Sequence, residues 1–169
     1  SVHPVRQGRV VVSSSTGTSS SRANPFFMVA ERGCTEEHGV CYGFNLVYSG
    51  DHMESCEQNS YGRMRILSGI NPEGFSFVLE PGQTFQSPEA VMTYSASGLG
   101  GISSHMHAFV RRHIVRGYWA DRERPVLLNS WEAAYFDINE KKLLKLAKEA
   151  KKCGIELFVM DDGWFGHRD

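Results

Sequence analysis

The stretch that decides the fold is PVLLNSWEAAYFDINEKKLLKLAKEAKKCGIELFVMDDGWF, residues 125–165. VLLN at 126–129 is apolar and too short for a helix, which is typical of a strand buried on both faces, and IELFVM at 155–160 is a second such run. Apolar residues between them recur at the three- and four-residue steps of an amphipathic helix. The stretch therefore predicts a βαβ unit with parallel strands and a right-handed crossover.

The limits of this helix follow from its flanking residues. Asp137 is expected to cap it, and Glu140, three residues on, would complete a capping box, so the helix should begin near Asn139. Gly154 is the expected stop. The apolar stripe that would face the strands consists of Leu143, Leu146, Ala147, Ala150 and Cys153.

Upstream of about residue 100 the chain has a different rhythm. Short runs of β-branched, aromatic and aliphatic residues alternate with Gly, Pro, Asn and Asp, which predicts an antiparallel β-sandwich. The predicted strands are 10–12, 26–30, 42–48, 64–67, 75–79 and 90–94.

A helix is predicted between these two regions. Ser103 or Ser104 can cap it, it should run to about Val115, and Gly117 should end it. We therefore expect three segments: part of a β domain over 1–101, a helical connector over 102–124, and the strand–helix–strand region over 125–169.

Composition excludes several classes of function. The 169 residues are 41% hydrophobic and 22% charged, and the formal net charge of −1 gives no pull toward nucleic acid or an anionic membrane. No apolar run approaches the roughly 20 residues of a membrane span. The chain starts at Ser1 and stops just after a predicted strand, so we expect it to be cut at both ends. Localisation stays open, with a slight preference for the cytoplasm.

Cysteine and histidine spacing indicates no metal or redox motif. The cysteines form no CxxC pair and are typical of free thiols in a reducing compartment, although a bridge between Cys34 and Cys41 stays open. His105 and His107 lie two apart on a predicted helix, so their side chains would point to different faces. The four cysteines are Cys34, Cys41, Cys56 and Cys153.

The residues that follow the two parallel strands are the candidate site. The carboxyl ends of parallel strands share one edge, so Trp131 should lie near Asp161 and Asp162. An aromatic ring packs on the C–H face of a sugar while carboxylates accept hydroxyl protons, which favours a sugar site. An ordinary Asp-Asp-Gly turn is the alternative, and a metal site would require further ligands, with His167 the nearest candidate.

Several blocks resemble glycoside hydrolase family 36 α-galactosidases of the bacterial and fungal type. The blocks are NSWEAAYFD (129–137), DDGWF (161–165), TEEHGVCYGFNLVYSG (35–50), GINPEGFSFVLEPGQTFQSPEAVMTYS (69–95) and GLGGISSHMHAFVRRHIVRG (98–117). The resemblance implies an N-terminal β-supersandwich, a (β/α)8 barrel and a C-terminal β domain. On this basis the chain would hold the later part of the sandwich and the first two barrel strands.

The resemblance also implies a function for the full-length parent. Family members hydrolyse terminal α-galactosides such as melibiose and raffinose with retention, using two aspartates and no cofactor. The blocks that carry those aspartates do not occur here, so the chain alone is expected to be inactive. Trp131 matches a tryptophan lining the galactose site, Asp161 and Asp162 match the pair that binds galactose hydroxyls, and a homotetramer is implied.

Two other functions are compatible with the sequence. A galactosyl-transferring enzyme of the same family would share the site, and product analysis with excess acceptor sugar would separate it from a hydrolase. A non-catalytic carbohydrate-binding β module would lack the two catalytic carboxylates. The sequence after Asp169 would decide between this module and an enzyme.

Overall fold

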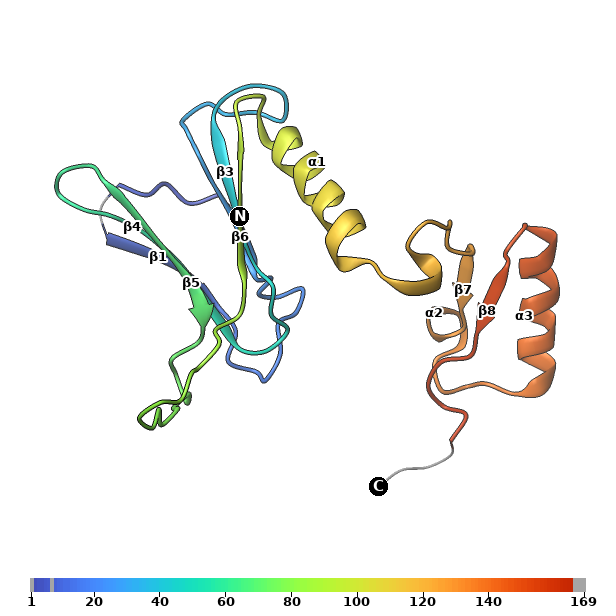
Figure 1. Ribbon diagram of the computed structural model, residues 1–169. Helices are drawn as coiled ribbons and strands as arrows, with labels where there is room; N and C mark the ends of the chain where they lie inside the picture. The colour runs from blue at the N-terminus through green and yellow to red at the C-terminus, as the bar shows by residue number, and fades with distance from the viewer. Residues whose placement is uncertain (1, 7, 166–169) are drawn as a thin grey trace. The chain divides into compact units, whose positions relative to one another are not determined.

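The computed structural model describes residues 2–6 and 8–165 (Figure 1). The chain divides into two compact units, residues 1–112 and residues 113–169. Each unit is described by itself.

The first unit contains two three-stranded antiparallel sheets (Figure 1). In each sheet the central strand pairs with one strand that is distant in sequence, so neither sheet is a simple meander. In pairing order the strands are β1 (Gly8–Ser13), β4 (His52–Gln58) and β5 (Met64–Ile70) in one sheet, and β2 (Phe26–Ala30), β3 (Cys41–Leu46) and β6 (Ala90–Ser95) in the other. The antiparallel prediction is confirmed.

Two strand predictions differ from the structure. β4 was not predicted, because its inward positions carry the polar residues His52 and Glu54, which are 0% and 1% exposed. The predicted strand 75–79 is wrong, since this segment forms no strand. Its alternating aromatic rings pack locally instead, with the centroids of Phe75 and Phe77 lying 5.9 and 4.7 Å from that of Phe85.

Helix α1 (Leu99–Phe109) packs against β3 and β6 of the second sheet. The fully buried Ile102 lies so close to Gly43 that a Cβ there would be 2.6 Å from its Cγ2. The predicted start at Ser103 or Ser104 is wrong, because the residue that precedes the helix is Gly98, with φ +77°. The chain continues through a π-helical turn, η1 (Val110–Ile114), and a 3-10 turn, η2 (Gly117–Trp119).

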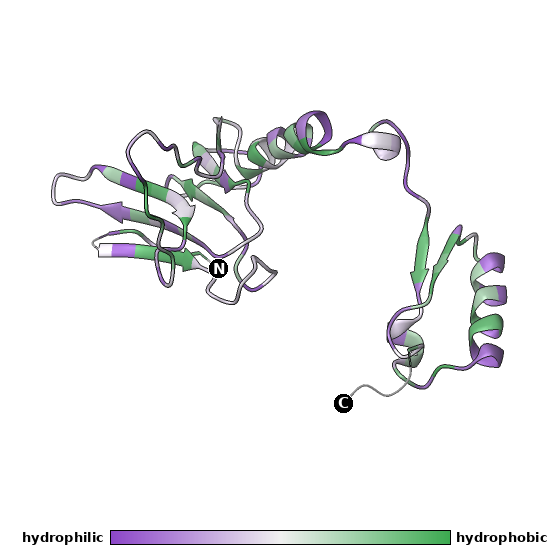
Figure 2. Ribbon diagram, turned by 60° about the horizontal axis from the view of Figure 1, so that its bottom comes forward, coloured by the Kyte–Doolittle hydropathy of each residue, from purple (hydrophilic) through white to green (hydrophobic). Residues whose placement is uncertain are grey.

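The second unit is the predicted strand–helix–strand unit. β7 and β8 pair in parallel, with Asn129 opposite Val159, and helix α3 connects them. Figure 2 shows both strands as mostly hydrophobic and α3 with hydrophilic and hydrophobic residues alternating along the ribbon. A short helix, α2, was not predicted. The elements are β7 (Leu127–Asn129), α2 (Trp131–Ala134), α3 (Glu140–Lys152) and β8 (Leu157–Val159).

The start of α3 near Asn139 is confirmed, but its cap differs from the prediction. The Oδ1 atom of Asn139 accepts the Lys142 backbone N–H at 3.0 Å. Asp137 lies outside the helix and forms an ion pair with the Lys142 ammonium group. The capping box with Asp137 and Glu140 is therefore wrong, because the true cap lies two residues later.

Candidate functional site

The carboxyl ends of β7 and β8 are joined by Ser130. Its backbone N–H donates to the Val159 carbonyl at 2.9 Å, and its hydroxyl accepts the Asp161 N–H at 3.1 Å. Ser130 is 1% exposed, so these bonds are shielded from water. The first residues after each strand are thereby held at one edge of the sheet.

Asn129 connects the two predicted sugar-binding segments. Its Nδ2 donates to the Asp161 Oδ2 at 2.5 Å, and its Oδ1 accepts the Trp131 backbone N–H at 2.8 Å. One amide group thus fixes the backbone of the tryptophan and the carboxylate of the aspartate. This role of Asn129 is not predictable from the sequence, because the bond depends on the strand register.

Asp161 is stabilised as a carboxylate. The hydrogen bond from Asn129, followed by that from the Asp162 N–H to Oδ1 at 2.7 Å, holds the pKa of Asp161 below its ordinary value of 3.8. Both oxygens accept one bond and each keeps a further lone pair. Asp161 is half-buried and Asp162 is exposed, so both carboxyl groups reach solvent.

Trp131 is the first residue of an aromatic cluster. Its ring meets those of Tyr135 and Phe136 edge-on, with centroids 5.3 and 4.9 Å away. Tyr135 ends α2 with φ +48°, a backbone conformation that non-glycine residues rarely adopt, and its hydroxyl donates to the Glu132 carboxylate at 3.2 Å.

Gly163 ties the second segment to the first. A Cβ at this position would lie 3.2 Å from the Phe136 Cα, and its φ of +99° favours glycine. The Asp-Asp-Gly turn therefore packs directly on the chain that follows Trp131. The structure brings Trp131 and Asp161 to one edge, with Asp162 beside them.

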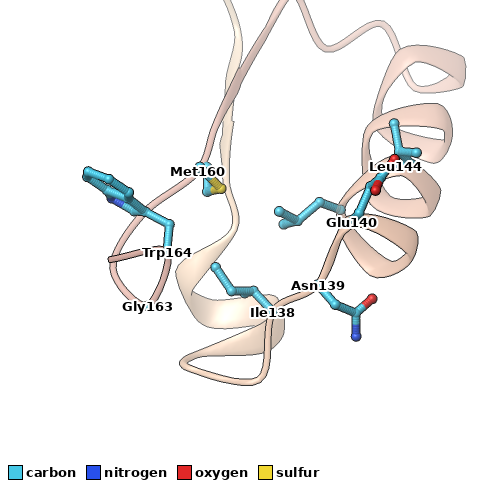
Figure 3. Close-up of a pocket in the computed structure, with 8 residues that line it drawn as sticks. Ile138, Asn139, Glu140, Leu144, Met160, Gly163 and Trp164 are labelled. Carbon is cyan, nitrogen blue, oxygen red and sulfur yellow. The ribbon is translucent and has the colours of Figure 1, made fainter. Parts of the chain in front are cut away.

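An open, mostly apolar hollow of about 470 Å³ lies between the start of α3 and the turn after β8 (Figure 3). Trp131, Asp161 and Asp162 do not line it, and among the described residues that do, Glu140 alone is acidic. The hydrogen-bonded strand ends carry the polar groups that a sugar requires, so we assign the candidate site to them and not to this hollow. The lining residues are Ile138, Asn139, Glu140, Leu143, Leu144, Met160, Gly163 and Trp164.

The chemistry available at this edge is recognition of hydroxyl groups. Asp161 accepts hydrogen bonds from Asn129 and from the Asp162 N–H, and the adjacent Asp162 carboxyl group is exposed to a ligand. In the described part of the chain no three His, Cys, Asp or Glu side chains gather where they could hold a metal ion, and His167 lies outside the described residues. The described helices include none with the length and apolarity of a membrane span.

Comparison with protein families matches the chain in two consecutive parts. Residues 1–80 match the glycosyl hydrolase family 36 N-terminal domain, and residues 84–169 match the melibiase family. The two matches together cover both units of the structure.

Curated relatives show the same likeness. The chain is 46% identical over 166 residues to α-galactosidase AgaA of Geobacillus stearothermophilus, covering 98% of this chain and 23% of AgaA. It is 48% identical over 155 residues to α-galactosidase C of Emericella nidulans, covering 92% of this chain and 21% of that protein. The chain thus spans about a quarter of the length of such relatives.

Solved structures agree in three dimensions. The crystal structure of AgaA superposes with a TM-score of 0.90 at 45% identity, over 98% of this chain and 23% of that one. AgaA variants have been solved in complex with raffinose and with stachyose, each with a TM-score of 0.89 to this chain.

Proposed function

This chain belongs to the glycoside hydrolase family 36 α-galactosidases, and we propose that the whole protein hydrolyses terminal α-D-galactosides with retention of configuration. The observation that supports this most is the identity of 46% with AgaA over 98% of the chain, which includes both strand ends of the candidate site. The raffinose and stachyose complexes of AgaA variants support galactosides of this type as substrates.

Within this function, the edge formed by β7 and β8 binds galactose. Trp131 packs on the apolar face of the sugar, while Asp161 and Asp162 accept hydrogen bonds from its hydroxyls. The lowered pKa of Asp161 supports this role, since a carboxylate that stays ionised remains an acceptor at acidic pH. The nucleophile and the acid/base lie outside this chain, and no cofactor is required.

The proposed architecture extends the two units into a larger protein. Residues 1–101 form part of an N-terminal β-supersandwich, 102–124 connect it to the next domain, and 125–169 supply the first two strands of a (β/α)8 barrel. Parallel pairing of β7 with β8, with α3 as the crossover, is the unit from which such a barrel is built. A homotetramer of the full-length protein is proposed on family resemblance.

The test is an assay of the full-length protein with melibiose, raffinose and an aryl α-galactoside. We expect galactose release, with NMR showing the α-anomer formed first, as retention requires. Release of the β-anomer first, or no hydrolysis of all three substrates by folded protein, would refute the proposal. If excess acceptor sugar diverted most of the galactose into transfer products, the enzyme would be a transferase of the same family.

A further inference from the structure

The segment that connects β2 to β3 brings two thiols close together. Cys41 is the first residue of β3 and is 0% exposed, while Cys34 lies in the connecting segment and is half-buried. The Cys34 side chain lies near enough to the Cys41 thiol to contribute, after burial, to raising the pKa of Cys41, and both are free thiols in this structure. Two cysteines at this separation in the chain meet because the segment folds back on itself.

The fold-back is defined by backbone hydrogen bonds. The Glu31 N–H donates to the Val40 carbonyl at 3.0 Å, which extends the β2–β3 pairing, and the Cys34 N–H donates to the Glu31 carbonyl at 3.2 Å. At Gly39, which has φ +101°, a Cβ would lie 2.8 Å from the Cys34 Cα. The absence of a side chain at Gly39 therefore lets Cys34 lie directly against the end of β3.

The loop is also fixed from outside, by the amino terminus of α1. The N–H groups of the first residues of this helix find acceptors in the loop at 2.8–2.9 Å, so loop and helix order each other. The cysteines are consequently held near each other in the folded protein before any bond forms. These bonds run from Gly98 to Gly39, from Leu99 to Thr35 and from Gly100 to Glu36.

The surroundings favour a two-sulfur reaction over metal binding. Burial is the main cause that raises the pKa of the Cys41 thiol, Ser95 lowers this pKa, and the exposed Glu31 carboxylate raises it. The same carboxylate accepts the Val40 N–H at 2.7 Å. Among the described residues no third ligand joins the two sulfurs to complete a metal set.

We propose that Cys34 and Cys41 are a modification site, a dithiol that is reversibly oxidised to a disulfide by a low-molecular-weight disulfide such as glutathione disulfide. The Cys34 thiolate attacks one sulfur of the oxidant and expels one glutathione thiolate. The Cys41 thiolate then attacks Sγ of Cys34 and expels the second. Two electrons pass from the cysteine pair to the oxidant, and the two thiol protons end on two molecules of glutathione.

The two cysteines have different parts in this reaction. Cys34 is accessible to the oxidant, whereas burial raises the pKa of the Cys41 thiol and keeps it protonated at neutral pH. Closure of the ring is therefore the slow step. Its rate should rise about tenfold per pH unit while the Cys41 thiolate is scarce.

The test is a redox titration of the full-length protein in glutathione buffers, followed by alkylation and digestion with an endoproteinase that cuts after glutamate. Glu36 and Glu37 lie between the two cysteines, so the digest separates them unless a disulfide joins the peptides. Cys56, buried in β4, and the exposed Cys153 are internal controls that should be alkylated singly.

We expect the linked 34–41 peptide pair, lost on reduction and absent from a Cys34→Ser variant. The effective concentration of the two thiols, measured against glutathione, should be at least about tenfold higher in native protein than in concentrated urea. Equal values in the two states would show that the fold does not create the site. Arrest at a glutathione adduct on Cys34, or single alkylation of both thiols under all conditions, would also overturn the proposal.

Discussion

Asn129 shows how much of the candidate site depends on one side chain. Its amide donates to Asp161 and accepts from the backbone of Trp131, so it links the two segments that follow β7 and β8. If water replaced either hydrogen bond, the distance between Trp131 and Asp161 would no longer be fixed by a single side chain. Asn129 is thus a positioning residue for the proposed sugar-binding groups.

Replacement of Asn129 by Asp or Ala should separate this role from general stability. Asn129→Ala should lower kcat/KM of the full-length enzyme about 10- to 100-fold, the worth of a hydrogen bond to a charged group. Asn129→Asp should lower kcat/KM as much at neutral pH, because the introduced carboxylate would repel that of Asp161. The introduced carboxyl can donate to Asp161 once protonated, so this variant alone should recover relative to wild type as the pH falls.

The measurement is the pH profile of kcat/KM for both variants against wild type. Acid recovery of Asn129→Ala, or its absence in Asn129→Asp while that protein stays folded, would contradict a charge-dependent role. Wild-type Asp161 should stay ionised throughout, since its pKa is lowered.

Asp161 and Asp162 should contribute to binding and not to bond cleavage. Asp→Ala at either position should lower kcat/KM about 10- to 1000-fold, because hydroxyl contacts strengthen in the transition state. Azide should not restore turnover of an activated aryl galactoside, since an external nucleophile replaces a missing nucleophile but not a hydroxyl contact. Formation of β-galactosyl azide by either variant would identify that residue as the nucleophile.

Among the elements, β4 carries an unusual buried carboxyl group. The Oε1 atom of Glu54 accepts from Ser68 at 3.3 Å, and no partner for Oε2 is found in the described residues. Burial raises the pKa of Glu54 above its ordinary value of 4.5, while His52 acts in the opposite direction. The protonated Glu54 carboxyl group therefore makes its full contribution to the free energy of unfolding below pH 4.5, and this contribution is lost as the pH rises through the raised pKa.

Glu54→Gln should remove this pH dependence. The variant should melt about 2–5 °C above wild type at neutral pH, and the difference should vanish below pH 4.5. Thermal unfolding across this pH range is the measurement, with Glu57→Gln on the same strand but half-buried as the matched control. A variant that is less stable than wild type at neutral pH would show that interactions in the folded protein offset the cost of burying the Glu54 carboxylate.

Helix α3 allows a test of its cap. Asn139→Ala should cost about 1 kcal/mol, because it removes the acceptor for the Lys142 N–H. Asp137→Ala removes an exposed ion pair and should cost less than about 0.5 kcal/mol. Denaturant midpoints of both variants provide the comparison. A larger loss of stability for Asp137→Ala than for Asn139→Ala would show that Asp137 is the residue that caps the helix.

The accuracy of the sequence predictions varies from element to element for physical reasons. The parallel unit was predictable because β7 and β8 are apolar and α3 has a clear periodicity. β4 was missed because polar His52 and Glu54 face inward. The start of α1 was misplaced because its first N–H groups bond to residues 35–39, which are distant in sequence.

The candidate site was predictable only in part. Trp131 and Asp161 were predicted to lie at one edge, because each follows a strand and the carboxyl ends of parallel strands share an edge. The bond from Asn129 could not be predicted, since it requires the register that places Asn129 opposite Val159. The sugar-binding roles themselves stay predictions.

At the scale of the whole molecule, the 169-residue chain exposes much apolar surface. In the second unit, Leu127 and Leu157 of the two paired strands are 50% and 42% exposed, and Phe136 and Trp164 are more so. Exposed apolar patches beside open strand edges favour association.

Produced by itself, this chain should therefore self-associate and bind a hydrophobic dye. Light scattering coupled to size exclusion, with dye fluorescence per mole of chain, measures both. The full-length protein is the control and should show a defined mass and weaker fluorescence. A monodisperse, non-binding 169-residue monomer would mean that the two units cover their own surfaces.

The order in which strands pair also governs when each part can fold during synthesis. β1 cannot pair until β4 has been synthesised. One edge of β3, residues 41–46, stays unpaired until residues 90–95 of β6 have been translated. A nascent chain that has grown past β5 can complete its first sheet while the β3 edge of the second is still unpaired. Unpaired edges recruit other strands, so the pace of translation between β5 and β6 sets how long this edge of the growing polypeptide stays open to association.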